Sequence, residues 1–263
     1  MQGRLDRFAT LGLAVALLAP TGLGCATQSA AERQHATRKA ASHVAVGADH
    51  LANGRPALAL REFRLAERLD PENPRPHYAL GGAYLAQGKL EDGERHLRRS
   101  LELHPDHHDA RQSLAALLIK TARYEEAIRE CDRLVDDPTY TSPWVALTNR
   151  ASAEFMLGRL DEARDTLALA LDYRDRYWPA VLTLAGIENK LGRRLEAIRL
   201  YREVIALDPG PGVESEVNYR LAEIHVSLGQ RQQAVGHLTA SVARDPGSRW
   251  AKQSQEYLKR LHP

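Results

Sequence analysis

The chain has 263 residues, of which 43% are hydrophobic and 27% are charged, so it can bury a substantial core beneath solvated outer faces. Aromatic residues make up only 6%, so Ala and Leu must fill that core, which favours closely packed helices over a sheet sandwich. The net charge of +2 excludes a broad basic field for nucleic acid, and two cysteines are too few for a disulfide framework.

The first 25 residues have the pattern of a secretory signal. Arg4 and Arg7 precede an almost continuously apolar run from Phe8 to Ala19, and a stretch of small residues then ends at Cys25. The apolar run is too short to span a bilayer, which takes about 20 residues. We therefore predict a signal peptide over residues 1–25.

The end of this segment resembles the lipobox of bacterial lipoproteins, in which the cysteine becomes the first mature residue and receives lipid. Gly22 and Leu23 stand where that family prefers Leu and a small residue, respectively. The resemblance implies lipidation of Cys25, and Ala26 in place of Asp implies sorting to the outer membrane, facing the periplasm. The alternative is ordinary cleavage nearby, for instance after Ala26 or Ala31, which would give a soluble periplasmic protein.

Six repeats follow a polar tether that we expect at residues 26–39. A turn signal recurs at intervals of 34 to 37 residues, with a small residue five positions and a bulky residue nine positions after each turn. Another small residue lies seven positions before each turn. The turn residues are Gly54, Gly88, Ala122, Gly158, Gly192 and Gly229. A period near 34 residues is that of the tetratricopeptide repeat.

We predict two helices in each repeat. Helices of this length become stable only by burying an apolar face against their neighbours. The small residues suit a close helix crossing, and glycine at the turn permits the positive φ that ends the first helix. The resemblance implies an all-α, right-handed superhelical solenoid of six helix–turn–helix repeats over residues 40–247. The predicted units are 40–73, 74–107, 108–143, 144–177, 178–214 and 215–247. A C-terminal capping helix is expected at residues 248–263, with Tyr257, Leu258 and Leu261 facing inward.

The sequence contains no catalytic constellation, so we expect neither an enzyme nor a bound cofactor or metal. The run His104-Pro105-Asp106-His107-His108-Asp109 has metal-binding residue types, but a solvated turn between repeats is the favoured interpretation. Cys131 occupies the bulky position of its repeat and is expected to be a buried, inert thiol.

Binding is therefore expected on the solenoid surface itself. In the tetratricopeptide repeat family, the first helix of each repeat lines a concave surface that holds a peptide. Carried over by position, that surface would comprise Tyr78, Leu85, Gln112, Ile119, Asn149, Phe155, Leu182, Asn189, Tyr219 and Val226. These residues are apolar or neutral, which favours an apolar or amphipathic partner segment. The same residues could instead belong to the core, and the convex face remains an alternative contact surface.

An exported, lipid-anchored array of this kind resembles the type IV pilus pilotin lipoproteins, which help an outer-membrane secretin reach its membrane and assemble. This resemblance implies a scaffold or adaptor with a protein or peptide partner, attached to the membrane by lipid, with no nucleic-acid partner. The alternative is a general cell-envelope scaffold for polysaccharide export, outer-membrane protein assembly or cell-wall synthesis. The partner and the oligomeric state are not determined by the sequence.

Overall fold

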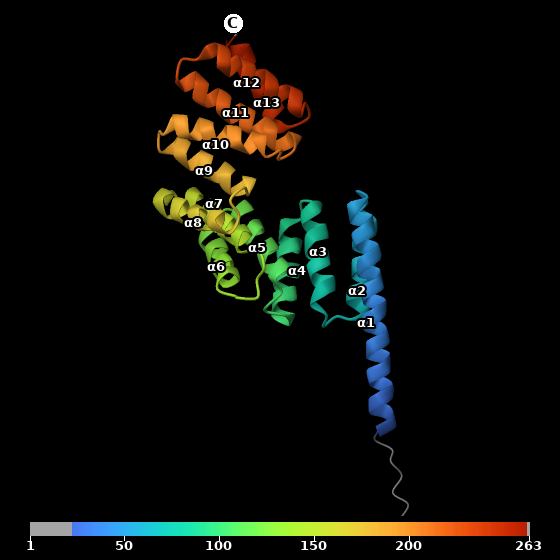
Figure 1. Ribbon diagram of the computed structural model, residues 1–263. Helices are drawn as coiled ribbons and strands as arrows, with labels where there is room; N and C mark the ends of the chain where they lie inside the picture. The colour runs from blue at the N-terminus through green and yellow to red at the C-terminus, as the bar shows by residue number, and fades with distance from the viewer. Residues whose placement is uncertain (1–22, 262–263) are drawn as a thin grey trace, which may run out of the picture.

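The computed structural model describes residues 23–261, which form thirteen helices and no strands (Figure 1). The helices are α1 (Leu23–Ala52), α2 (Pro56–Leu69), α3 (Pro74–Ala86), α4 (Leu90–Leu103), α5 (His108–Lys120), α6 (Tyr124–Val135), α7 (Pro143–Met156), α8 (Leu160–Tyr173), α9 (Trp178–Lys190), α10 (Arg194–Ala206), α11 (Pro211–Ser227), α12 (Arg231–Arg244) and α13 (Arg249–Leu261). Most of the predicted signal peptide lies outside the described residues, as do the side chains of residues 23–29, including Cys25.

Successive helices pack as six helix–turn–helix pairs that stack in chain order (Figure 1). Each helix contacts the next, and the first helices of neighbouring repeats also touch, as α1 with α3, α3 with α5, α5 with α7 and α7 with α9. The helix α13 lies against α11 and α12. The prediction of an all-α solenoid of six repeats closed by a capping helix is confirmed.

The six turn residues share one backbone conformation. Their φ angles are all positive, between 59° at Ala122 and 82° at Gly158. Glycine reaches this left-handed region without a steric penalty, whereas a residue with a Cβ atom pays about 1–2 kcal/mol. The prediction for the turn glycines is therefore confirmed, and Ala122 adopts the same turn at a cost that the other five repeats avoid.

The small and bulky positions of the repeats form the core between the two helices of each pair. The small positions on both sides of the turn are buried, and the bulky ones are at most 3% exposed. Space at the glycines is tight, because a Cβ atom on Gly47 would lie 2.4 Å from the Phe63 ring, and one on Gly93 would lie 2.5 Å from Leu85. Cys131 is fully buried, and burial raises the pKa of its thiol to about 12.

The capping helix α13 covers the open end of the last repeat. Trp250 and Ala251 are buried, while Tyr257, Leu258 and Leu261 are partly buried and pack against the cluster formed by Ala222, Ala234 and Leu238. The three side chains predicted to face inward therefore do so. A solenoid needs such a cap because its last repeat would otherwise expose an apolar face.

One repeat boundary differs from the predicted unit. The helix α11 begins at Pro211, four residues before the expected start of the sixth unit at residue 215, so Pro211 and Gly212 belong to its first turn. Proline suits this position because the missing N–H has no helical acceptor there and φ is already helical. Gly210 precedes the helix with a φ of 91°, which turns the chain into it.

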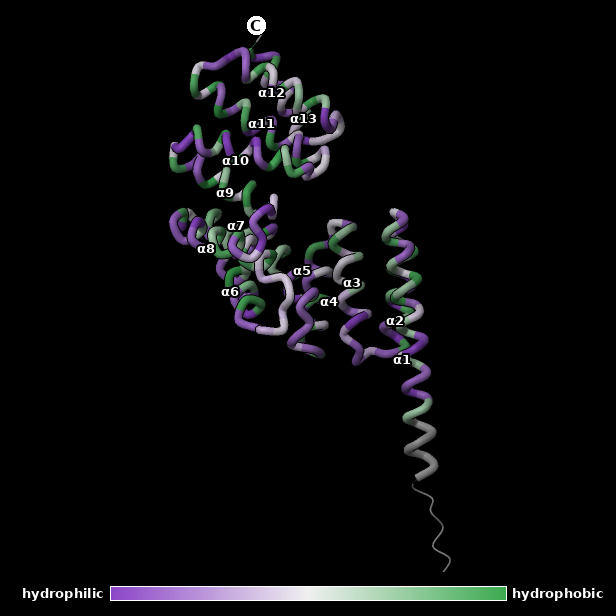
Figure 2. The backbone as a smooth tube through the Cα atoms, viewed as in Figure 1, coloured by the Kyte–Doolittle hydropathy of each residue, from purple (hydrophilic) through white to green (hydrophobic). Residues whose placement is uncertain are grey.

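The first helix is much longer than the others, with 30 residues, and its N-terminal part extends beyond the rest of the array (Figure 1). Residues 30–39 are almost all exposed, and Ala40 is the first fully buried residue. The segment expected to be a tether is therefore helical and continuous with the first repeat. Between residues 23 and 261, no helix combines the length and apolarity needed to cross a membrane (Figure 2).

Candidate binding surface on the first helices

The first helices of the repeats (α1, α3, α5, α7, α9 and α11) present a recurring register of positions that are accessible everywhere except at Thr148, and we call this register the first-helix surface. These positions lie ten, nine, six, three and two residues before each turn residue. They recur on one side of a helix because the spacing follows its period of 3.6 residues. Two grooves lie on this surface, a mainly apolar one in the N-terminal half of the array and one with a mixed lining in the C-terminal half.

The N-terminal groove lies between α1, α3 and the start of α5 and has a volume of about 650 Å³. Val44 and Leu51 from α1 and Tyr78 from α3 contribute much of its apolar wall, and Arg75 and Asp109 bring opposite charges to it. Val44 and Leu51 stand ten and three residues before Gly54, in the same register as Tyr78 and Leu85 in the next repeat. The sequence analysis omitted them, although this register identifies them.

The C-terminal groove has a volume of about 480 Å³ and lies mainly between α7, α9 and α11. Phe155, Leu182 and Asn189, all predicted members of the surface, line it together with the small residue Gly186. The ammonium group of Lys190 lies 5.3 Å from the centroid of the Phe155 ring, a cation–π contact at the groove wall. Glu216 and Arg220 also line the groove, so it combines apolar side chains with charges of both signs.

All ten residues predicted to form the surface are half-buried in the structure. Those that line a cavity are Tyr78, Gln112, Phe155, Leu182, Asn189 and Tyr219. Those that line none of these cavities are Leu85, Ile119, Asn149 and Val226. Three of these four pack partly against the core, and Leu85 is the side chain that lies against Gly93. Contact with a partner stays a prediction for all ten.

Asn149 belongs to the first-helix surface but occupies a different position of the repeat from the other predicted residues. It stands nine residues before the turn residue Gly158, whereas Tyr78, Gln112 and their counterparts stand ten before theirs. Thr148 holds the position ten residues before the turn and is buried, with its hydroxyl donating to the Trp144 carbonyl at 2.7 Å. The fourth repeat therefore closes a position that the other repeats leave accessible.

A polar cavity of about 450 Å³ lies beside the N-terminal groove and contains the histidine-rich turn between repeats. Its histidines have separate partners: His107 Nδ1 lies 2.7 Å from the Ser100 hydroxyl, and His108 Nε2 lies 2.7 Å from the Asp137 carboxylate. The hydrogen bond from His108 lowers the pKa of Asp137 to about 2. His104 is exposed, so the turn does not gather its three histidines around one point.

The contact between the two helices of a repeat carries a recurring polar pair that the sequence analysis missed. Its members lie eleven residues before and eight residues after the turn, nineteen residues apart. The pairs are His43 with Glu62 at 2.7 Å, His77 with His96 at 3.4 Å, Arg111 with Glu130 at 2.6 Å and Asn218 with His237 at 2.9 Å. The fourth and fifth repeats hold Leu147 with Thr166 and Val181 with Leu200 at the same positions. The constant spacing of nineteen is the signal that identifies the pairs.

Several solved structures share this fold at low sequence identity. PilW, described as a widely conserved type IV pilus biogenesis factor, matches 81% of this chain and 97% of its own, with 19% identity and a TM-score of 0.72. PilF of Pseudomonas aeruginosa matches 86% of this chain and 99% of its own, with 16% identity and a TM-score of 0.68. The Cut9–Hcn1 structure of the APC/C also reaches 0.72, with 15% identity, over 89% of this chain and 46% of its own. At such identities the likeness establishes the fold alone.

The repeat family is recognised in the sequence itself. Profiles of the tetratricopeptide repeat match residues 78–140, and also residues 50–100 and 188–254. No curated protein sequence is significantly similar to this chain. The profile matches extend over residues 50–140 and 188–254, more than half of the chain, and they agree with the observed helix pairs. The chain therefore belongs to the tetratricopeptide repeat proteins.

Proposed function

We propose that the protein is an exported scaffold that holds a segment of a partner protein on its first-helix surface. The observation that carries this proposal is the pair of open grooves in which apolar side chains recur in a constant register. Solenoids of this family are protein-interaction modules rather than enzymes, and their extended surfaces are used for binding. A partner protein is therefore the expected ligand.

The groove linings define the chemistry of that segment. Apolar walls with isolated charges, such as Arg75 and Asp109 at one end and Lys190 and Glu216 at the other, suit an amphipathic helix or an extended strand with alternating side chains. Apolar side chains of the partner would fill the grooves, and its polar groups would meet the charges. Affinity would come mainly from the buried apolar area, and orientation from the charges.

We propose further that the protein is an outer-membrane lipoprotein, facing the periplasm, that assists assembly of a type IV pilus secretin. The signal-like N-terminus ending at Cys25 supports export and lipidation, and the similarity to nearly the whole length of PilW supports the link to pilus biogenesis. The Cut9–Hcn1 match is equally high at 0.72, so the fold also suits other assemblies. A general cell-envelope scaffold is therefore the second candidate.

The long helix α1 would act as a spacer between a lipid on Cys25 and the array. Fifteen residues separate Cys25 from Ala40, the first fully buried position, which corresponds to roughly 22 Å of helix at a rise of about 1.5 Å per residue. The exposed, polar surface of residues 30–39 suits such a stalk. The first-helix surface would thereby be held a short distance from the membrane.

Membrane attachment is tested by Cys25→Ser. We expect the variant to leave the outer-membrane fraction while its helical circular dichroism and melting temperature match those of the parent, because Cys25 lies 15 residues before the first fully buried position. If the variant still sediments with outer membranes, the lipid anchor is wrong. Ordinary cleavage would predict that the parent itself is soluble in the periplasm.

The role in secretin assembly is tested by outer-membrane fractions from cells with and without the protein, probed for heat- and detergent-resistant secretin multimers. Loss of the multimers with persistence of the monomer supports the proposal, and unchanged multimers contradict it. Tyr78→Ala then connects the role to the N-terminal groove. Tyr173→Ala is the matched control, because Tyr173 lies on the second helix α8 and is 62% exposed. Only the first variant is expected to reduce the multimers.

A further inference from the structure

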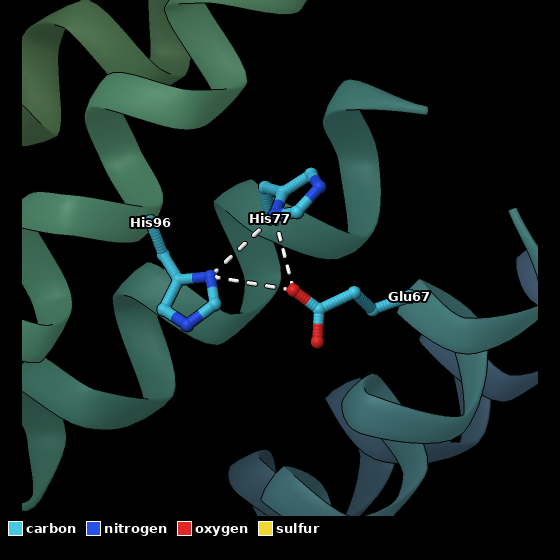
Figure 3. Close-up of side chains that lie close together, drawn as sticks. All are labelled: Glu67, His77 and His96. Atoms are coloured by element: carbon cyan, nitrogen blue, oxygen red, sulfur yellow. Dashed lines mark hydrogen bonds and ion pairs between the residues drawn. The ribbon is translucent and has the colours of Figure 1, made fainter. Parts of the chain in front are cut away.

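We infer that Glu67, His77 and His96 form a binding site for a divalent transition metal, with zinc as the ion that fits best. The three residues come from α2, α3 and α4, respectively, and their side chains converge on one point (Figure 3). One ligand atom of each lies within 4.8 Å of the other two. Among the described residues, this is the one group of three or more potential ligands gathered so closely.

The distances between the three ligand atoms are close to those of tetrahedral coordination. His77 Nδ1 lies 3.4 Å from His96 Nδ1 and 3.4 Å from Glu67 Oε1, and His96 Nδ1 lies 3.8 Å from the same oxygen. Zinc–nitrogen and zinc–oxygen bonds of about 2.0–2.2 Å at tetrahedral angles separate neighbouring ligand atoms by roughly 3.3–3.6 Å. The ion would therefore enter this cluster with only small side-chain movements.

The hydrogen bonding of His77 leaves its Nδ1 atom available as a metal ligand. Its Nε2 lies 3.0 Å from the Pro71 carbonyl oxygen, which can only accept, so the proton resides on Nε2. The lone pair of Nδ1 consequently faces His96 and Glu67. A second ring nitrogen that donates to a backbone carbonyl is the usual way in which proteins orient a metal-binding histidine. His77 is only 6% exposed, so its ring is fixed by its surroundings.

The His96 ring is held on the other side of the cluster by aromatic stacking. Its centroid lies 5.3 Å from that of Tyr84 and 5.7 Å from that of His77, with nearly parallel planes in both cases. The Tyr84 hydroxyl accepts a hydrogen bond from Arg64 at 2.7 Å, which fixes the stacking partner.

The sequence supports a specific role for Glu67. It stands thirteen residues after the turn residue Gly54, and the other five repeats fill this position with aliphatic residues. Those residues are Leu101, Val135, Leu171, Ile205 and Val242. A carboxylate at a position otherwise reserved for packing costs stability unless it has a partner. The side chain is 29% exposed, so water can reach the cluster and complete a tetrahedron.

A metal at this point would connect the first two repeats, because Glu67 belongs to the first and both histidines belong to the second. The N-terminal groove lies between the same two repeats, on α1 and α3. The ion would therefore fix the relative position of the groove walls, whichever partner the groove holds. Because the three ligands come from separate helices, the ion would cross-link α2, α3 and α4 and stabilise the folded state.

The test is a zinc titration of the purified full-length chain in detergent, without a polyhistidine tag and after removal of metals with a chelator. We expect one zinc ion to bind per chain by calorimetry. Glu67→Leu introduces the residue type of the other repeats, so it should fold normally and bind zinc at least about tenfold more weakly. His96→Gln should weaken binding similarly. His104→Gln, in the exposed turn between repeats, is the control and should bind like the parent.

A second measurement separates this site from any other. Zinc should raise the melting temperature of the parent by several degrees, because a ligand that binds only the folded state stabilises it. The same addition should leave the melting temperature of Glu67→Leu nearly unchanged. No saturable zinc binding by the parent, or an equal rise in both proteins, would overturn the inference. The cluster would then be a metal-free hydrogen-bonded pair of histidines beside an acid.

Discussion

The third and fifth repeats have the same helix–turn–helix arrangement but fill the contact between their helices in opposite ways. The third repeat places Arg111 and Glu130 there, 2.6 Å apart and each less than 15% exposed. The fifth places Val181 and Leu200 at the equivalent positions, 2% and 4% exposed. The fold tolerates both because the adjoining small and bulky positions already set the helix crossing. The pair beside them can therefore be charged or apolar. In the second repeat it is His77 and His96, which lie close to Glu67.

The C-terminal repeats place their buried charge elsewhere. Glu188, 4% exposed, accepts hydrogen bonds from Arg164 at 2.8 Å and from Arg193 at 3.1 Å. Glu154, 1% exposed, pairs with Arg150 at 2.8 Å. Both glutamates stand four residues before their turn, on the first helix. The third repeat and the fourth and fifth repeats thus place their buried ion pairs at different positions of the repeat. A charged residue introduced at the position used by another repeat would lack its partner.

The largest loss of stability is expected when the arginine of the third repeat is introduced at the equivalent position of the fifth. Val181→Arg would bury a guanidinium without a partner and should lower the free energy of unfolding by about 4 kcal/mol. Urea denaturation followed by circular dichroism measures the loss. Addition of Leu200→Glu should restore about half of it by supplying the missing carboxylate. A loss below about 1 kcal/mol for Val181→Arg would contradict the distinction between the two repeats.

Replacing the charged pair of the third repeat by apolar residues should cost less stability. Arg111→Leu leaves Glu130 with only the exposed Arg133, 2.9 Å away, and should cost about 2 kcal/mol. The double variant Arg111→Leu with Glu130→Leu should return to within about 1 kcal/mol of the parent, since an apolar pair of similar volume replaces the ion pair. The same denaturation series gives all three values. Additive losses would show that the two residues are not coupled.

One added methyl group should destabilise the close helix crossing in the second repeat. Gly93→Ala places a Cβ atom 2.5 Å from Leu85 and should cost about 1–3 kcal/mol through overpacking. Gly236→Ala on α12 is the matched control, because nothing lies within 4 Å of a Cβ atom there. The control should be stabilised by about 0.5–1 kcal/mol, the usual gain in a helix interior. Equal effects of the two substitutions would contradict the packing explanation.

Glycine should stabilise the turn of the third repeat, whereas alanine should destabilise the turns that already have glycine. Ala122→Gly removes the Cβ atom from a residue with a φ of 59° and should raise the free energy of unfolding by about 1 kcal/mol. Gly88→Ala introduces the same strain at a φ of 74° and should lower it by about 1 kcal/mol. Thermal melts of both variants provide the measurement. A stabilised Gly88→Ala would refute the role of backbone conformation.

The smallest effect concerns acid stability beside the histidine-rich turn. The pKa of Asp137 is lowered to about 2 in the folded protein, so its stabilising contribution is present above the ordinary pKa of 3.8 and is lost as the pH falls through 2. Asp137→Asn should therefore lower the melting temperature at pH 6, with a difference that shrinks towards pH 2. The exposed Asp175→Asn serves as control and should show no such convergence.

The fold was predictable because its determinants repeat along the chain. Turn glycines, small residues and bulky residues return every 34 to 37 positions, so six weak signals reinforce one another. Ala122 illustrates the strength of the pattern, since the turn forms there without glycine. The start of α11 at Pro211 was less predictable, because a Pro-Gly-Pro-Gly stretch indicates either a loop or a helix start.

The sites were harder to predict because their residues come from several helices. The register of Tyr78 and Leu182 identified part of the first-helix surface, and extension to the first repeat would have added Val44 and Leu51. The cluster of Glu67, His77 and His96 forms no linear motif, since its members lie ten and nineteen residues apart. Only the packing of α3 against both α2 and α4 brings them together. The adjacent histidines of the turn suggested a site more strongly, yet the structure gives them separate partners.

The most direct test of the central claim, that the first helices bind the partner, is site-specific photo-crosslinking in cells. A photoreactive amino acid would replace Tyr78 or Leu182 on the first-helix surface, and Leu169 or Tyr173 on α8, whose side chains are 54% and 62% exposed. We expect the two first-helix positions to give adducts with the same partner protein, and the two α8 positions to give none. Adducts from Leu169 or Tyr173 alone would place the partner on the second helix α8 and contradict the account.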